Sequence, residues 1–164
     1  MSEYAQVTNN DGLITDVNRE EGYATLTLNR PDRLNSLGSE LLKSLVDSLK
    51  SVASDDSIRA IIITGAGRAF CSGADTDEMA GGKSDGPHKP GPEGAEGLRR
   101  GFHLAQEVIL GIHEMEKPII ASNIGGSNET IIDEKTGFLF ESGNAKSLSK
   151  KILKLLWLLQ NLDK

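Results

Sequence analysis

Residues 73–75, Gly-Ala-Asp, are a candidate for chemistry in this 164-residue chain. They follow a continuous apolar run at residues 59–64, which is typical of a buried parallel strand, and they precede a possible short helix at 75–80. Backbone N–H groups at the start of a helix lack partners within the helix and point outward, so they favour anions or oxyanions. The same three residues can also form an ordinary turn and helix cap.

Histidine and cysteine give no second site. His103 and His113 are ten residues apart on a predicted helix, which separates them by about 80° around the helix axis. No second carboxylate or cysteine completes a metal-binding set with them, so we expect no metal site. No histidine is placed to activate Cys71, which we interpret as a small buried residue.

The elements that must position these residues alternate between strands and helices. Residues 23–29 alternate apolar and polar side chains with a period of two, which is typical of a half-buried strand. A helix capped by Ser36 or Ser39 follows, because apolar residues then recur at helical spacing. The predicted apolar stripe of this helix consists of Leu42, Leu45, Val46, Leu49 and Val52.

The alternation of strands and helices is interrupted at residues 81–97 and then resumes. Residues 81–97 hold six glycines and three prolines, which indicates a mobile loop or a disordered insert. A helix is predicted over 98–116, with Leu98, Phe102, Ala105, Ile109 and Ile112 as its apolar stripe. The remaining predicted elements are strands at 118–122 and 138–140, a short helix from 125 to about 133, and a helix at 145–162 capped by Ser142 or Asn144. This alternation predicts an α/β protein with a mainly parallel sheet and flanking helices.

Composition excludes several classes of partner. The net charge of −6 argues against binding to nucleic acid, which needs clustered Lys and Arg. The single cysteine fits a reducing compartment, and the polar start does not resemble a signal peptide. The longest apolar run, residues 155–159, is too short to span a bilayer. We therefore expect a cytoplasmic protein with neither nucleic acid nor membrane as a partner.

Two motifs stand on either side of the predicted helix, LNRPDRLNSL at residues 28–37 and IIITGAGRAFCSGAD at residues 61–75. Both resemble motifs of the crotonase superfamily, the enoyl-CoA hydratases and isomerases, and they lie at the family's usual separation. The resemblance covers about residues 10–121. It implies that a CoA thioester is the ligand, with no further cofactor required.

The resemblance also assigns roles to individual residues. Ala74 matches the position whose backbone N–H is one of the family's two oxyanion donors, and such a donor is typically worth ~3–4 kcal/mol. Arg33 and Leu34 would lie along the CoA moiety. Ala69, Asp75 and Thr76 would lie beside the pantetheine and adenine. Taken alone, Arg33 would be read as a solvated surface charge.

The crotonase pattern breaks after residue 122. The family continues with a run of the form G-x-x-x-G-G-G, which holds the second oxyanion donor, and its catalytic carboxylates follow. This chain instead reads NIGGSNE at residues 123–129. The spacing and neighbours do not support Gly126 as the second donor or Glu129 as the acid. We therefore expect little or no hydratase activity.

Residues 117–158 are similar to a different family, the donor-binding domain of retaining glycosyltransferases with two Rossmann domains. The sequence KPIIASNIGGSNETIIDEKTGFLF, at residues 117–140, carries this resemblance. It implies that Gly125, Gly126 and Glu129 lie near a sugar nucleotide. The family's main nucleotide contacts lie in upstream segments that are not found here.

The chain is therefore interpreted as an engineered or recombined chimera. Crotonase-like ββα units at 1–121 are joined to a Rossmann-like, glycosyltransferase-like βα tail at 122–164, packed in the same domain. A charge shift accompanies the join, since residues 1–121 hold 19 acidic and 12 basic side chains and residues 122–164 hold 5 and 6. The alternatives are a non-enzymatic joining of two folds and a nucleotide-sugar-binding fragment. The apolar helix around Trp157 is either core or a face for self-association.

Overall fold

The fold rests on one mixed sheet in the computed structural model, which describes residues 5–79, 92–122, 133–135, 137–141 and 144–160. Its strands are β1 (Ala5–Asn10), β2 (Leu13–Asn18), β3 (Tyr23–Leu28), β4 (Ala60–Gly65), β5 (Ile119–Ser122) and β6 (Phe138–Phe140). Its helices are the 3-10 turn η1 (Pro31–Arg33), α1 (Ser39–Ser54), α2 (Thr76–Met79), α3 (Pro92–His113) and α5 (Ala145–Gln160).

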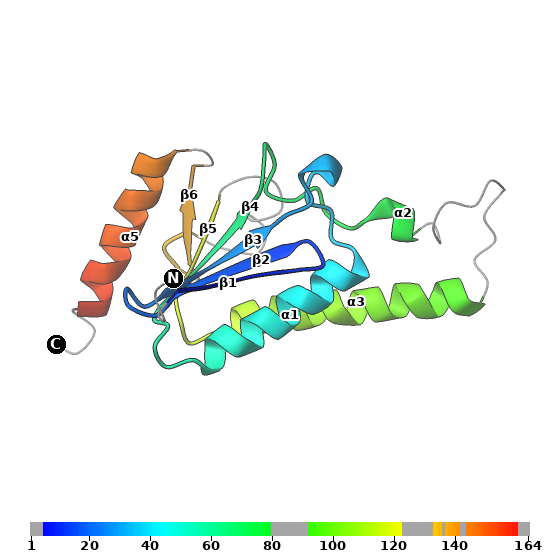
Figure 1. The fold of residues 1–164 in the computed structure, drawn as a ribbon, viewed down its shortest axis with the longest axis horizontal. Coiled ribbons are helices and arrows are strands. Elements are labelled where there is room, and N and C mark those ends of the chain that lie inside the picture. Colours follow the sequence, from blue (N-terminus) through cyan, green and yellow to red (C-terminus); the bar gives the residue numbers. More distant parts are fainter. Residues whose placement is uncertain (1–4, 80–91, 123–132, 136, 142–143, 161–164) are drawn as a thin grey trace.

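The strands lie side by side in chain order, from β1 to β6 (Figure 1). Strand β2 runs antiparallel to both of its neighbours, β1 and β3, and β3, β4, β5 and β6 are parallel. The prediction of an α/β protein with a mainly parallel sheet and flanking helices is confirmed. Because parallel strands need crossover connections, α1 and α3 carry the chain back between β3, β4 and β5.

The hairpin of β1 and β2 was not predicted. Its two-residue turn, Asp11-Gly12, has positive φ at both positions, 47° and 83°. Tight hairpins favour this geometry, and Asp-Gly is a strong sequence signal for it. The strands around the turn mix apolar residues with Asn and Thr and do not alternate strictly, so their hydrophobic periodicity is weak.

Helix α1 presents the predicted stripe to the core, and all five of its residues are buried. The prediction of a Ser36 or Ser39 cap is wrong. Gly38 is the N-cap and provides no side-chain hydrogen bond. The Glu78 carboxylate accepts the Ser39 N–H instead, at 2.7 Å, and a carboxylate at this end of a helix also suits the helix dipole.

Helix α3 corrects two predictions. It begins at Pro92, so residues 92–97 of the predicted loop are helical; proline is well tolerated in a helix's first turn, where its missing N–H costs nothing. Phe102 and Ile109 of the predicted stripe are 62% and 53% exposed. The helix packs along α1 (Figure 1) and turns a neighbouring face inward. Its core contacts are Leu104, Ala105, Val108 and Ile112. The other end of the predicted loop, residues 81–91, lies outside the described residues.

Helix α5 covers the other face of the sheet, beside β6 and away from α1 and α3 (Figure 1). Its Leu155 joins a second apolar cluster with Ile120, Phe138 and Phe140, and Ala60 packs against that cluster. The predicted Asn144 cap is confirmed, since its Oδ1 accepts the Ser147 N–H at 3.0 Å. The alternative cap, residue 142, and residues 125–132 of the helix predicted from 125 to about 133 lie outside the described residues, and Asp133 forms an isolated bridge with Gly137.

A lysine on the loop before β5 caps the C-terminus of α1. Lys117 Nζ donates to the Val52 and Asp55 carbonyl oxygens at 2.6 and 2.7 Å. Lys117→Met removes both bonds, so we expect the free energy of unfolding to fall by about 1–3 kcal/mol in urea denaturation. Lys50→Met is the control, because Lys50 pairs with Glu107 at the surface and such pairs contribute less than about 1 kcal/mol. Equal losses in the two variants would contradict the capping role.

Candidate site at the carboxyl ends of the parallel strands

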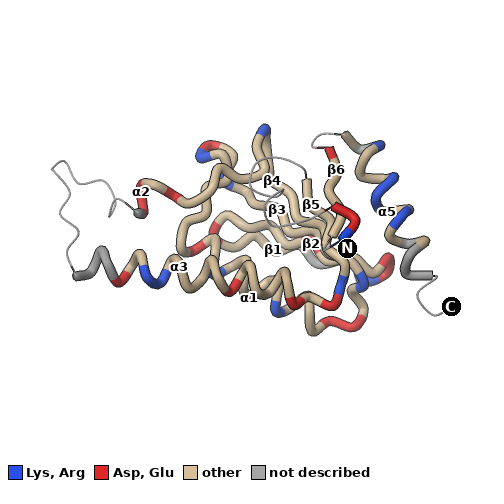
Figure 2. The backbone as a smooth tube through the Cα atoms, turned by 180° about the vertical axis from the view of Figure 1, so that it is seen from behind, with Lys and Arg blue, Asp and Glu red and all other residues tan. Residues whose placement is uncertain are grey.

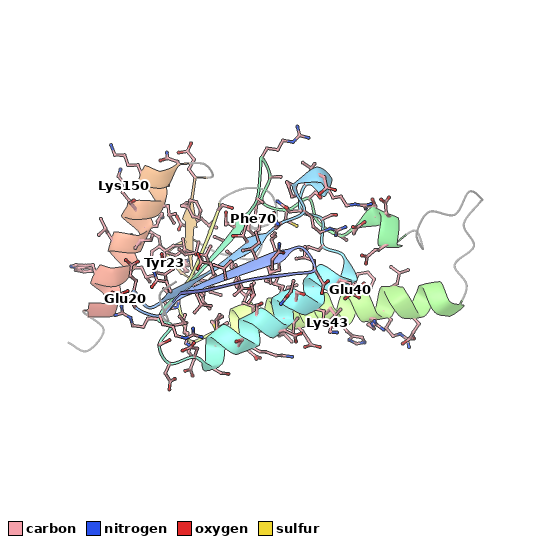
Figure 3. All side chains as sticks on the ribbon, viewed as in Figure 1. Glu20, Tyr23, Glu40, Lys43, Phe70 and Lys150 are labelled. Atoms are coloured by element: carbon pink, nitrogen blue, oxygen red, sulfur yellow. The ribbon has the colours of Figure 1, made fainter. Side chains whose placement is uncertain are left out.

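The candidate site lies where β3 and β4 end, at the paired residues Leu28 and Gly65. Two loops leave the sheet there, residues 29–38 and 66–75, and Phe70 lies on the second of them (Figure 3). Because parallel strands deliver their carboxyl ends to the same edge, residues far apart in the sequence meet there. Ligands of open α/β sheets generally bind at this edge.

Asn35 ties the two loops together. Its side chain is fully buried, and its Oδ1 accepts the Arg30 N–H at 2.8 Å. Its Nδ2 donates to the Ala66 and Ala69 carbonyl oxygens at 2.9 and 2.7 Å. The backbone of Asn35 is left-handed, with φ of 56°, a conformation that Asn adopts more readily than most residues. Sequence reasoning did not single out Asn35.

Asp75 is the buried charge of the site, with only 4% of its surface exposed. It accepts hydrogen bonds from an Arg30 guanidinium nitrogen at 2.7 Å and from Ser36 Oγ at 3.2 Å. Burial alone favours the neutral acid, but the bonds from Arg30 and Ser36 outweigh it and hold the pKa of Asp75 below its ordinary value. Asp75 was predicted as a site residue, whereas Arg30 and Ser36 were not.

The backbone around Ala74 leaves one donor unused. Leu37 forms an isolated parallel bridge with Ala74. The Leu37 N–H donates to the Gly73 carbonyl oxygen at 2.8 Å, and the Asp75 N–H donates to the Leu37 carbonyl oxygen at 3.1 Å. Within the described residues, the Ala74 N–H donates to no acceptor, and Ala74 is exposed. A free, outward N–H is what an anion or oxyanion requires, but the oxyanion role itself stays a prediction.

The other predicted pocket residues lie on the same two loops or directly after them. Arg33 is anchored by Asp77 at 2.8 Å and lies 3.6 Å from Asp75. Leu34 and Ala69 are half-buried, and Thr76 is exposed as the first residue of α2. The predicted residues on the two loops are Arg33, Leu34, Ala69, Ala74 and Asp75, and Thr76 follows the second loop. The nucleotide-sugar candidates Gly125, Gly126 and Glu129 lie outside the described residues.

Neither a reactive thiol nor a metal cluster adds to this site. Burial raises the pKa of the Cys71 thiol, although the hydrogen bond with the Gly73 backbone opposes the shift, so the thiol form dominates at neutral pH. Within the described ranges, no group of three or more His, Cys, Asp and Glu side chains could hold a metal ion. A hollow of about 260 Å³ lies elsewhere, between α1 and the β1–β2 hairpin, and includes Thr15 and Ser48 in its lining.

The fold and these loops define an α/β protein with a backbone donor presented at the ends of its parallel strands. The family model described as enoyl-CoA hydratase/isomerase matches residues 18–123. The chain belongs to the enoyl-CoA hydratase/isomerase family. A second model, described as glycosyl transferases group 1, matches residues 108–159.

Curated relatives agree with the first match. The chain is 41% identical over 125 residues to the probable enoyl-CoA hydratase echA12 of Mycobacterium leprae, covering 73% of this chain and 38% of that protein. It is 37% identical over 103 residues to the 1,2-epoxyphenylacetyl-CoA isomerase of Escherichia coli K12, covering 63% of this chain and 37% of that protein. The chain thus spans less than two fifths of these relatives' length.

Solved structures give the same fold. An enoyl-CoA hydratase from Mycobacterium smegmatis is 29% identical with a TM-score of 0.52, covering 73% of this chain and 39% of that one. An enoyl-CoA hydratase/carnithine racemase from Magnetospirillum magneticum is 27% identical with a TM-score of 0.57, covering 71% and 39%. Among the described residues, no helix has the length and apolar character needed to cross a membrane.

Proposed function

We propose that this chain is a crotonase-derived domain that keeps part of a pocket for a CoA thioester. The observation that carries the proposal is the free Ala74 N–H, held at the ends of the parallel strands by the bridge to Leu37. A thioester oxygen would accept this N–H. Arg33 offers a positive charge to the phosphates of CoA, with Leu34 along the same moiety.

Three further residues complete the proposed pocket wall. Ala69, Asp75 and Thr76 would line the pantetheine and adenine. Beyond the thioester itself, the proposal requires no cofactor.

The proposed domain hydrates double bonds slowly or not at all. One oxyanion donor polarises a thioester less than two donors do, and each is worth ~3–4 kcal/mol. The sequence at 123–129 offers neither a second glycine donor nor an acid at the family's spacing. Without an acid–base pair, the addition of water to an enoyl thioester has no proton donor or acceptor.

We also propose that the chain is a chimera, engineered or recombined, with its join at residues 117–122. Two family models support this, because they match adjoining parts of the chain and overlap only at residues 108–123. The apolar contacts of the tail fit such a join. Phe138, Phe140 and Leu155 pack with Ile120 and Ala60 of the first part. In this proposal, 1–121 and 122–164 form one packed domain.

Calorimetric titration with acetyl-CoA tests the pocket. We expect binding by the wild type, binding about tenfold weaker in Arg33→Gln, and stronger binding in Asp77→Asn, because Asp77 competes with a phosphate for the Arg33 guanidinium. Arg19→Gln is the control, since Arg19 pairs with Asp55 away from both loops. Absence of binding by the wild type would refute the pocket. Crotonyl-CoA hydration at ordinary rates of ~1–1,000 per second would refute the proposed loss of activity.

The match over residues 108–159 favours a second candidate, a nucleotide-sugar-binding fragment. In that case Gly125, Gly126 and Glu129 would contact the ligand, and a uridine-sugar would give heat in the same calorimeter while acetyl-CoA would not. If neither ligand binds, the result would favour the third interpretation, a non-enzymatic joining of two folds.

The outer face of α5 supports a proposal about association. Leu153 and Trp157 are 66% and 63% exposed and lie one helical turn apart. Lys150 points away from the sheet on the same helix (Figure 3), and Figure 2 shows that basic residues recur along it. We propose that α5 carries a self-association face.

We also propose that the protein works in the cytoplasm.

A further inference from the structure

The direction of the Ala74 N–H is fixed by a neighbouring strand segment. The Gly73 carbonyl oxygen accepts the Leu37 N–H at 2.8 Å. That carbonyl and the Ala74 N–H belong to one planar trans peptide group, so they point in opposite directions. The Ala74 N–H therefore points directly away from Leu37, and it keeps this direction only while the bridge between the two segments holds.

Side-chain packing does not hold the bridge from the Gly73 side. Gly73 has φ of 98°, a conformation that other residues rarely adopt, and a Cβ placed there would meet no described atom within 4 Å. Ser72 and Ala74 on either side of it are exposed. The segment therefore depends on polar contacts made by its one buried residue, Asp75.

Arg30 makes two of the contacts that join the two segments, beside the bond from Ser36 Oγ to Asp75. One guanidinium nitrogen donates to the Ser36 carbonyl oxygen at 2.8 Å, and the other donates to the Asp75 carboxylate at 2.7 Å. Ser36 directly precedes Leu37 and Asp75 directly follows Ala74. The Arg30 guanidinium therefore bonds to a neighbour of each of the two bridge residues. The Arg30 backbone is itself fixed, because its N–H donates to Asn35 Oδ1.

We propose that Arg30 is a positioning residue, which aims the Ala74 N–H at the thioester oxygen by clamping residues 36 and 75 together. The inference rests on the proposed function and adds the group that sets the donor's direction. Lysine cannot replace arginine here, since a single ammonium does not reproduce the two-pronged geometry of a guanidinium.

Amide hydrogen exchange on the ligand-free protein tests the clamp. In Arg30→Lys, we expect the Leu37 and Asp75 amides, which form the bridge, to exchange about tenfold faster or more than in the wild type. Arg33→Lys is the matched control, because the Arg33 side chain pairs with Asp77 and Asp75, and Arg33 contacts Ser36 only through its backbone carbonyl oxygen, which the substitution leaves in place. Its bridge amides should exchange at the wild-type rate. Unchanged exchange in Arg30→Lys would overturn the clamp, whether or not the protein binds CoA.

Infrared spectroscopy of a bound crotonyl-CoA labelled with ¹³C at its thioester carbonyl tests whether Arg30 directs the Ala74 N–H at the thioester oxygen. The wild type should shift the carbonyl band to lower frequency, and Arg30→Lys should return it toward the free position while its affinity for CoA itself is unchanged. An equal shift in both proteins would overturn the positioning role. If the wild type binds no thioester, the proposed function fails, and the exchange rates still decide whether Arg30 holds the bridge.

Discussion

Asn35→Asp should lower the free energy of unfolding by about 3 kcal/mol, although the two side chains have nearly the same shape. The substitution removes both donors that Nδ2 gives to Ala66 and Ala69. It also places a carboxylate oxygen against those two carbonyl oxygens at a fully buried position. A buried, unpaired carboxylate is costly, so the folded state would have to take up a proton or open the loops.

Urea denaturation followed by circular dichroism measures this loss. Asn144→Asp makes the same chemical change at the N-cap of α5, where Oδ1 accepts the Ser147 N–H. Aspartate caps a helix about as well as asparagine, so this variant should change stability by less than about 1 kcal/mol. Similar losses in the two variants would show that Asn35 does not tie the loops together.

Arg30→Met should cost about 2–3 kcal/mol at pH 7, because it removes the closest ion partner of a carboxylate that is only 4% exposed. The loss should depend on pH. In the wild type the pKa of Asp75 is held low, since the bonds from Arg30 and Ser36 outweigh the effect of burial. Folding therefore gains stability from Asp75 above its unfolded pKa of about 3.9, and this gain is lost as the pH falls through the lower folded value.

In Arg30→Met the folded pKa of Asp75 should rise from its wild-type value, because the Ser36 and Asp77 bonds and Arg33 remain but the Arg30 guanidinium no longer opposes the effect of burial. The stability gap between wild type and variant should therefore be largest near neutral pH and should narrow as the pH falls below about 4. Urea titrations across this range measure the gap. Arg33→Met is the control, because Arg33 lies farther from Asp75, at 3.6 Å, and its closer partner Asp77 is exposed, so its loss should stay below about 1 kcal/mol. A gap that does not change with pH would exclude Asp75 as its source.

Sequence periodicity predicted the elements in which buried apolar residues recur at regular intervals along the chain. Strand β3 and helix α1 were found because their apolar residues repeat at the periods of a strand and a helix, and these residues are buried. The same reasoning was only partly right at α3, where Ala105 and Ile112 of the predicted stripe pack against the core but Phe102 and Ile109 remain exposed. Which face of a helix turns inward depends on its neighbour, here α1, and the apolar residues of α3 allow more than one face.

The candidate site was predicted only through its motifs. Ala74, Asp75 and Arg33 were named because they fall within family-like segments, and the fold places them on adjoining loops. Asn35 and Arg30 were missed, although they make the contacts that hold those loops. Their partners on the second loop lie 31 to 45 positions away in the chain, and no local pattern of residue types indicates a hydrogen bond over such a separation.

Strand β5 has consequences for how the molecule melts. All four of its residues are buried. Ile119 and Ala121 belong to the cluster beneath α1 and α3, whereas Ile120 belongs to the cluster beneath α5. If either cluster unfolds, β5 loses the apolar contacts on one of its faces. The other cluster then loses the support of the strand against which it packs. The parts of the chain before and after β5 are thus coupled in unfolding through one four-residue strand, so we expect neither part to unfold independently of the other.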